Sequence, residues 1–353
     1  MFKISKCLTA ALGGIAVMSI SNCRNSEEGK AERPNILYMM ADDHACRALS
    51  CYSGELNQTP NLDHIAREGV QFTNSFVTNS LCAPSRAVLL TGKHSHLNGI
   101  INNWIPFDST QQTFPKLLRK AGYQTAIIGK WHLNTQPTGF DYWKILPGQG
   151  EYYNPDFIEM GNKVRDTGHV TNIITDSGIE WLKERDQDKP FSLMIHFKAP
   201  HGIWMPDTTD LNKYEDAKFP LPSNFFDNYE GRKAAQQAGF NIWKDLRLTW
   251  LKILDEEIKD QRKRLIRKLN RLTPAQRKVW DKAYDPRIRE FRRTNPQGKE
   301  LARWKYPKYL IDYLRTISGI DRNVGRIMEY LKREGLAENT LVIYTSDQGR
   351  YLG

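Results

Sequence analysis

The chain has 353 residues, enough to bury a large core in one or two domains, and carries a formal net charge of +11 at pH 7. Residues 243–308 hold 21 Lys and Arg against 9 Asp and Glu, a net of +12, so the remainder is near neutral at −1. Because the positive charge belongs to one segment and not to the whole surface, the composition argues against a nucleic-acid-binding protein.

Residues 1–23 have the pattern of a secretory signal. A basic start precedes an apolar run over residues 8–20, which is too short for a membrane span and is followed by Cys23. We expect export to the periplasm, or to the outer membrane of a Gram-negative bacterium as a lipoprotein. A lipid on Cys23 would then be the only membrane contact, and ordinary signal-peptidase cleavage is the alternative. Residues 24–32 are polar and predict a tether, with the folded domain at 33–353.

Three cysteines lie beyond the signal, an odd number for an oxidising compartment. Cys46 and Cys51 could form a disulfide or remain as small buried thiols. Cys82 is left over in either case, which suits a residue that is used in chemistry.

The first predicted strand is a continuous apolar run over residues 35–40, typical of a buried strand in a parallel sheet. Asp42 and Asp43 follow it directly. Ligands of open α/β sheets bind beyond the carboxyl ends of the strands, and two adjacent carboxylates are costly there unless a cation or hydrogen bonds satisfy them. We therefore favour a metal site for Ca²⁺ or Mg²⁺ over a solvated turn.

The stretch around Cys82 predicts a second functional junction. A helix is expected over residues 61–68 and a strand over 70–77, and Cys82 then stands where another helix begins. A helix N-terminus presents unpaired N–H groups and a partial positive charge, which favour anions. Arg86 lies four residues later and can share one helix face with Cys82. The local prediction is a sulfur that faces an anion pocket.

Three further apolar runs predict buried strands that are each followed by polar side chains. Helices are expected between them, so the alternation predicts one mostly parallel sheet flanked by helices. The strands and their following residues are 123–128 with Lys130 and His132, 191–197 with His201, and 340–345 with Asp347 and Gln348; the helices are 115–121, 170–184 and 310–331.

Two other segments complete the predicted organisation. Residues 137–154 are rich in Gly, Pro and aromatics and predict a loop that lines a site or packs on the surface. Residues 243–272 have apolar side chains at helical spacing and predict an amphipathic helical stretch, ended by Pro274. Its basic outer face is either a solvated surface or a rim that attracts a polyanionic substrate.

The expected edge of the sheet combines carboxylates, cations and histidines. Two carboxylate-bearing segments distant in sequence imply a metal clamp, and Lys130 and Arg86 supply positive charge. His132 and His201 can transfer protons. This pattern predicts hydrolysis of an oxyanion ester, either a sulfate or a phosphate.

The sequence resembles the type I sulfatases of the alkaline-phosphatase superfamily. The motif Cys-x-Pro-Ser-Arg followed by Thr-Gly is highly specific, and the other pieces are individually weak and jointly strong. The matching residues are Arg33 to Ile36 with Asp42 and Asp43, Cys82 to Arg86 with Thr91 and Gly92, Gly129 to His132, Pro200 with His201, and Thr345 to Gly349.

The resemblance implies an alkaline-phosphatase-like α/β fold, with 33–353 as the N-terminal catalytic domain and 243–308 as a basic helical insertion. Similar enzymes continue past the equivalent of Gly353 with a smaller C-terminal subdomain, so we expect a C-terminally truncated chain that lacks it. Arg350 stands where relatives often carry an aromatic residue.

The resemblance also implies a chemistry. Cys82 would be oxidised to formylglycine by a formylglycine-generating enzyme or an anaerobic sulfatase-maturating enzyme, and its hydrate would attack sulfur. His132 would assist the hydrate, His201 would protonate the leaving oxygen, and Arg86 and Lys130 would orient sulfate. The implied ligands of one Ca²⁺ are Asp42, Asp43, Cys82, Asp347 and Gln348.

The closest resemblance is to bacterial N-acetylglucosamine-6-sulfatases, which implies a sulfated glycosaminoglycan or mucin glycan as substrate. Iduronate-2-sulfatase and arylsulfatase activities remain open. A phosphatase or phosphodiesterase of the same superfamily is a second hypothesis, although these more often carry Thr or Ser as nucleophile. An inactive fragment that at most binds anionic glycans is a third.

Overall fold

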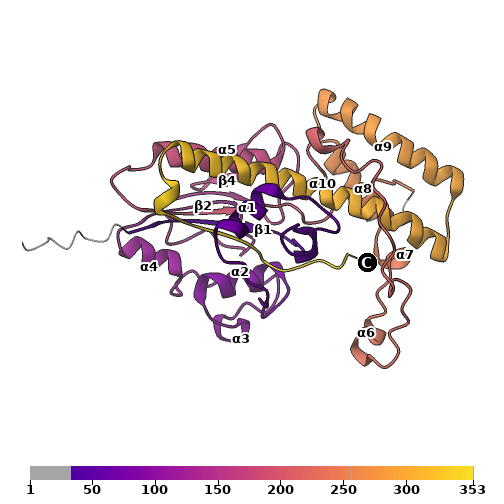
Figure 1. Cartoon of the computed structure of the whole chain (residues 1–353), viewed down its shortest axis with the longest axis horizontal. Helices are drawn as coiled ribbons and strands as arrows, with labels where there is room; N and C mark the ends of the chain where they lie inside the picture. The colour runs from indigo at the N-terminus through magenta and orange to yellow at the C-terminus, as the bar shows by residue number, and fades with distance from the viewer. Residues whose placement is uncertain (1–32, 256, 353) are drawn as a thin grey trace, which may run out of the picture. The chain divides into compact units, whose positions relative to one another are not determined.

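The computed structural model describes residues 33–255 and 257–352, and a seven-stranded sheet lies at its centre (Figure 1). The expected signal (1–23) and tether (24–32) lie outside the described residues. The strands are β1 (Asn35–Ala41), β2 (Gln124–Lys130), β3 (Tyr142–Leu146), β4 (Asp156–Glu159), β5 (Asn162–Arg165), β6 (Phe191–His196) and β7 (Thr340–Ser346).

The sheet has the order β5-β4-β3-β2-β6-β1-β7. The pairs β3–β2, β2–β6, β6–β1 and β1–β7 are parallel. At the other edge, β4 pairs with β3 and β5 pairs with β4 in antiparallel fashion. The predicted fold class, a mostly parallel α/β sheet, is confirmed.

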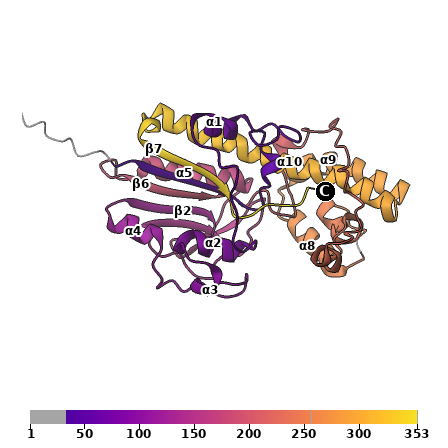
Figure 2. The ribbon, with the colours of Figure 1, turned by 60° about the horizontal axis from the view of Figure 1, so that its bottom comes forward.

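Helices cover both faces of this sheet (Figures 1 and 2). One face carries α1 (Pro60–Glu68), α5 (Val170–Glu184) and α10 (Gly298–Arg333), and the other carries α2 (Cys82–Thr91), α3 (Ser95–Asn98) and α4 (Phe114–Lys120). Side chains of a strand alternate between faces, so Leu193 and Ile195 of β6 join the core with α5 and α10. Met194, between them, joins the core with Ala83 and Ala87 of α2. This burial on both faces explains why most side chains of the strand are apolar.

The basic insertion differs from its prediction. Residues 243–272 do not form one amphipathic stretch, and Pro274 begins a helix where we expected it to end one. Thr273 and Gln276 form a reciprocal capping box there, and proline at the first helical position lacks only an N–H that would be unpaired anyway. The elements of this region are α6 (Lys233–Ala238), α7 (Ile242–Asp245), the 3-10 turn Leu248–Leu251, α8 (Lys259–Leu269) and α9 (Pro274–Thr294).

The strand expected over residues 70–77 is wrong. This segment is irregular, and Val70, Phe72 and Phe76 are exposed in the described chain. Its β-branched and aromatic residues have high strand propensity, but a strand forms only where a neighbouring strand accepts its backbone hydrogen bonds. The prediction of a loop over 137–154 is also partly wrong, because β3 lies within this range.

A disulfide between Cys46 and Cys51 is not formed. Both are free thiols, and Cys46 is exposed and not buried.

None of the helices in the described ranges combines the length and apolar character that a membrane span requires.

Candidate active site

The carboxyl ends of four strands meet at one edge of the sheet. Ala41 of β1 lies opposite Ser346 of β7, and Met40 lies opposite His196 of β6. Gly129 of β2 is also opposite His196. Because these strands are parallel, the residues that follow them emerge together. The structure therefore brings together the predicted residues: Asp42, Asp43, Lys130, His201, Asp347 and Gln348.

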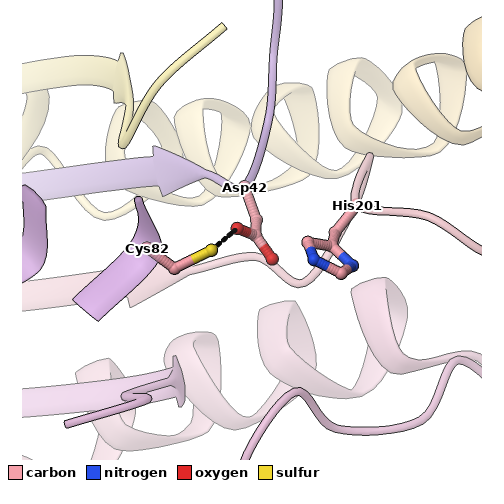
Figure 3. Close-up of side chains that lie close together, drawn as sticks. All are labelled: Asp42, Cys82 and His201. Carbon is pink, nitrogen blue, oxygen red and sulfur yellow. Dashed lines mark hydrogen bonds between the residues drawn. The ribbon is translucent and has the colours of Figure 1, made fainter. Parts of the chain in front are cut away.

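Cys82 is the first residue of α2 and points at this edge from the helix N-terminus. Its thiol donates to Asp42 Oδ1 over 3.5 Å (Figure 3), and Gln348 Nε2 lies 3.8 Å from the sulfur. The side chain is buried. Cys82, which was predicted to begin a helix, thus lies beside residues that follow β1 and β7.

Three carboxylates converge next to this sulfur. One oxygen from each of Asp42, Asp43 and Asp347 lies within 4.8 Å of the others. The Asp43 N–H donates to Asp347 Oδ1 at 3.1 Å, and Gln348 Nε2 donates to Asp43 Oδ1 at 2.7 Å. Gln348 Oε1 is buried without a partner in the described chain. Four oxygen-bearing side chains with an unused carbonyl oxygen fit a hard cation such as Ca²⁺.

The pKa values of the carboxylates also favour a bound cation. Burial and then the charge of Asp42 raise the pKa of Asp43. Burial and Asp42 also raise the pKa of Asp347 to about 7, against the opposing effect of Arg86. Like charges that share a site disfavour each other's ionised form, and a cation between them would remove that penalty.

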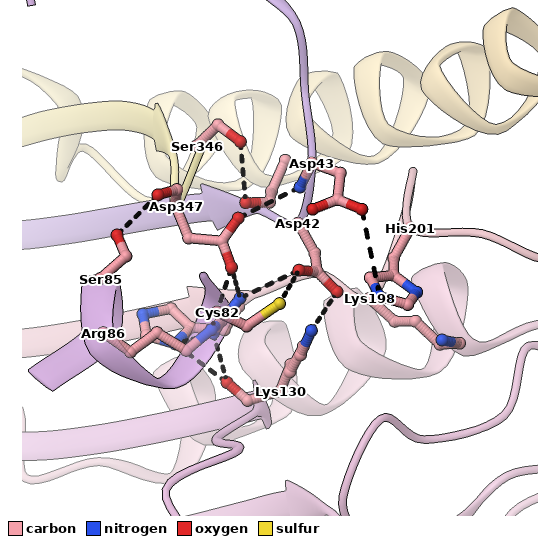
Figure 4. Close-up of polar contacts among 12 residues, drawn as sticks. Asp42, Asp43, Cys82, Ser85, Arg86, Lys130, Lys198, His201, Ser346 and Asp347 are labelled. Carbon is pink, nitrogen blue, oxygen red and sulfur yellow. Dashed lines mark hydrogen bonds and ion pairs between the residues drawn. The ribbon is translucent and has the colours of Figure 1, made fainter. Parts of the chain in front are cut away.

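Two buried cations sit among the carboxylates (Figure 4). Arg86 donates through Nε and one Nη to Asp347 Oδ2 at 3.2 and 2.9 Å, and through the other Nη to the Lys130 carbonyl at 2.8 Å. Lys130 Nζ forms a short ion pair with Asp42 Oδ2. Burial acts to raise the pKa of Asp42, but Lys130, His201 and Arg86 outweigh it and hold that pKa below its usual range.

The two histidines differ in how closely they approach the carboxylates. His201 Nδ1 lies 2.6 Å from the Gly202 carbonyl, so Nδ1 carries the hydrogen, and Nε2 lies 4.0 Å from Asp43 Oδ2. Burial followed by the charges of Lys130 and Arg86 lowers the pKa of His132 to about 4. His132 Nδ1 is buried and makes no hydrogen bond to the described residues. Both imidazoles are therefore neutral at neutral pH, since burial also lowers the pKa of His201.

A known family shares this architecture. The sequence model of the family described as Sulfatase matches residues 34–353, nearly the whole described chain. The chain belongs to the sulfatase family. The fold agrees with that membership, because the mixed sheet with flanking helices matches solved sulfatases.

Two comparisons find about half of the aligned residues of this sulfatase chain identical. It is 48% identical over 346 residues to an N-acetylglucosamine-6-O-sulfatase of Bacteroides thetaiotaomicron, covering 96% of this chain and 62% of that protein. It is 49% identical, with a TM-score of 0.87, to the solved structure of BT4656 in complex with its substrate D-glucosamine-2-N,6-O-disulfate. That match covers 91% of this chain and 66% of the solved one. The chain thus spans less than two thirds of either relative.

The same fold also occurs with another activity. A phosphonate monoester hydrolase of Agrobacterium radiobacter has a TM-score of 0.54 and 19% identity to this sulfatase chain. A likeness at that identity concerns the fold alone, because one fold supports several chemistries.

The thiol of Cys82 is a poor nucleophile in this sulfatase site. Burial, followed by the neighbouring charge of Asp42, raises its pKa to about 12. The reactive form of a cysteine is the thiolate, and catalytic cysteines normally have a lowered pKa. The unmodified residue therefore stays protonated at neutral pH.

Several residues of the site were not predicted. Ser85 Oγ donates to the Asp347 carbonyl at 2.6 Å, and Tyr313 of α10 donates to the Asp43 carbonyl at 2.8 Å. Arg350 lies 4.0 Å from Asp43 Oδ2 and over the Trp204 ring, where we had noted only a departure from relatives. Ser85 lies inside the Cys82 motif, so spacing offered a signal, whereas no local pattern marks Tyr313.

Proposed function

We propose that this chain is the N-terminal catalytic part of a sulfatase that hydrolyses the 6-O-sulfate of N-acetylglucosamine in glycosaminoglycans or mucin glycans. The observation that carries the proposal is the buried Cys82 at the start of α2, beside Asp42 and next to Arg86 and Lys130. The support for the sugar is the similarity to the N-acetylglucosamine-6-O-sulfatase and to BT4656.

Asp42, Asp43, Asp347 and Gln348 would hold one Ca²⁺, together with the modified residue 82. The close carboxylate oxygens and the unpartnered Gln348 Oε1 support this ligand set. When bound, Ca²⁺ would neutralise the carboxylates and polarise the oxygens of the ester.

The nucleophile would be made by oxidation of Cys82 to formylglycine, carried out by a formylglycine-generating or anaerobic sulfatase-maturating enzyme. Hydrated formylglycine would supply the hydroxyl that attacks sulfur. The raised pKa of the Cys82 thiol argues against the unmodified thiol as the nucleophile, because it stays protonated at neutral pH.

The remaining side chains would bind the anion and move protons. Arg86 and Lys130 would hold sulfate by charge in a site that excludes water. His132 is neutral above about pH 4 and can accept a proton from the nucleophile. His201 Nε2 would protonate the leaving oxygen. Its lowered pKa rises when the anionic ester binds, since an opposite charge favours the protonated imidazole.

The proposal is tested by measuring sulfate released from 6-O-sulfated N-acetylglucosamine after co-expression with a maturating enzyme. We expect Cys82→Ala to abolish release, and a matched Cys46→Ala variant at an exposed free thiol to retain it. Release by Cys82→Ala at the unsubstituted rate would exclude this mechanism.

A second candidate is hydrolysis of phosphate or phosphonate esters, favoured by the shared fold of the phosphonate monoester hydrolase. The two functions are separated by kcat/KM for a sulfate and a phosphate ester of the same alcohol. We expect the sulfate ester to be preferred, and a preference for the phosphate ester would favour the second candidate.

The proposal extends to location. The apolar run at residues 8–20 and Cys23 would direct export and lipid attachment, and both lie outside the described residues. Radiolabelled palmitate incorporated into the full chain and lost in Cys23→Ala would support a lipoprotein, whereas a soluble periplasmic product would support ordinary cleavage.

A further inference from the structure

A basic cavity lies next to the proposed active site. It has a volume of about 340 Å³ and is lined by the loop 147–151, by Lys198 and Gly202, and by Arg264, Arg267 and Lys268 of α8. We call it the α8 cavity. It joins the catalytic edge of the sheet to the basic insertion, whose positive charge the proposed chemistry does not use.

The charges around the α8 cavity do not balance. Its lining includes five cationic side chains and two carboxylates. Lys268 forms a short ion pair with Glu151, and Arg271 pairs with Asp156 at 2.9 Å. Within the described residues, the side chains of Arg264 and Arg267 make no hydrogen bond or ion pair. Two guanidinium groups at a concave surface are therefore available to an anion.

Lys198 forms the inner wall of the α8 cavity. It is 2% exposed, and its Nζ donates to the Gln149 carbonyl at 2.9 Å and lies 4.9 Å from the Tyr152 ring centre. No carboxylate of the described chain pairs with it. Burial lowers the pKa of this amine to about 7, and an anion in the cavity would favour its charged form.

The α8 cavity lies on the side where the alcohol would leave. His201 is the proposed proton donor to the leaving oxygen. The next residue in the chain, Gly202, lines the cavity. Figure 4 shows Lys198 beside His201 and Lys130. A glycan whose ester oxygen meets His201 would therefore extend toward α8.

We propose that the α8 cavity is a second anion-binding subsite, which holds a further sulfate or carboxylate of the same glycan chain through Arg264, Arg267 and Lys198. This inference rests on the proposed glycan substrate. It assigns to the basic insertion the recognition of multiply charged oligosaccharides in preference to singly sulfated sugars.

The test is calorimetric binding to the uncleaving Cys82→Ala chain. The probes are a heparin tetrasaccharide with N-sulfates and uronates, and its N-desulfated, N-acetylated form, which keeps the carboxylates. We expect Arg264→Ala/Arg267→Ala to weaken tetrasaccharide binding at least about tenfold, because hydrogen bonds between charged groups are lost. Loss with both probes assigns the subsite to a carboxylate or an O-sulfate, and loss with the N-sulfated probe alone assigns it to the N-sulfate.

A matched control removes the same charge from the same helix. Lys259→Ala/Lys263→Ala lies outside the cavity lining, and Lys263 is exposed. Equal weakening by both double variants would overturn the subsite and leave only a general charge effect. If the active chain releases no sulfate while the Arg variant still selectively loses binding, the proposed reaction fails and the subsite stands.

Discussion

At the scale of single residues, the pKa values of similar carboxylates are shifted in opposite directions in this site. The pKa of Asp42 is held low because Lys130, His201 and Arg86 together outweigh its burial. The pKa of Asp347 is raised to about 7, because burial and Asp42 outweigh its pairing with Arg86. Asp347 and Asp43 both have a raised pKa, so a bound cation would favour the ionised form of each.

The raised pKa of Asp347 predicts how stability depends on pH. Between its ordinary value and about 7, the folded chain binds a proton that the unfolded chain has released. This contribution is present at low pH and is lost as pH rises through about 7. Buried histidines with lowered pKa contribute the opposite slope in this chain and in its Asp347→Asn variant alike, so the prediction concerns a difference. We expect the Tm of the chelator-treated chain, minus the Tm of its Asp347→Asn variant, to decrease from pH 5 to pH 8.

Added Ca²⁺ supplies the contrasting measurement. Because Ca²⁺ binds ionised carboxylates, it should raise the Tm more at pH 8 than at pH 5. The Asp347→Asn variant should lose most of this gain. Equal Ca²⁺ effects at both pH values would contradict the assignment of Asp347 to the cation.

The position of a site residue could be predicted where its side chain follows a strand or begins a helix. Asp42, Lys130, His201 and Asp347 could be placed together because the carboxyl ends of parallel strands share an edge. Tyr313 could not be placed, because it reaches Asp43 from mid-helix across 270 residues of sequence. Only the tertiary packing of α10 decides which of its buried faces contacts the site.

At the scale of elements, β2 and β6 approach unusually closely at Gly129. This residue has φ of +109°, and a Cβ there would lie 2.0 Å from the His196 carbonyl oxygen. Gly129 immediately precedes Lys130, so the close approach sets where that ammonium enters the site.

The boundaries of the strands could be predicted from the sequence where both faces of a strand are buried. The prediction failed at 70–77, where apolar residues are exposed.

Gly129→Ala is expected to reduce the free energy of unfolding by at least about 3 kcal/mol, because backbone must move to admit the methyl group. Gly148→Ala is the matched control, since Gly148 also has positive φ but has no atom within 4 Å of the added Cβ. Its expected loss is about 1 kcal/mol, from the left-handed backbone alone. Urea unfolding measures both, and equal losses would show that the close approach is not the cause.

At the scale of the whole molecule, buried charge connects the basic insertion to helix α10. Asp312 of α10 pairs with Lys252 at 2.6 Å and with Arg287 of α9 at 2.7 Å. Tyr284 of α9 also donates to it at 3.0 Å. The described residues from Pro34 onward form one compact unit that includes the insertion. These contacts join segments far apart in sequence, so local patterns could not reveal them.

Asp312→Ala would leave two buried cations without their partner. We expect a loss of about 3–5 kcal/mol in the free energy of unfolding, the usual penalty for breaking a buried ion pair on one side. Asp281→Ala is the control, because its pair with Arg277 on α9 is exposed and should contribute less than about 1 kcal/mol. Losses of similar size in urea unfolding would mean that the buried pairs do not anchor the insertion.

The most direct measurement of the proposed mechanism is the mass of the peptide that contains residue 82, taken from active protein after co-expression with a maturating enzyme. We expect an aldehyde in place of the thiol, in proportion to the sulfate that the preparation releases. Sulfate release by a preparation whose Cys82 is entirely an unmodified thiol would contradict the mechanism.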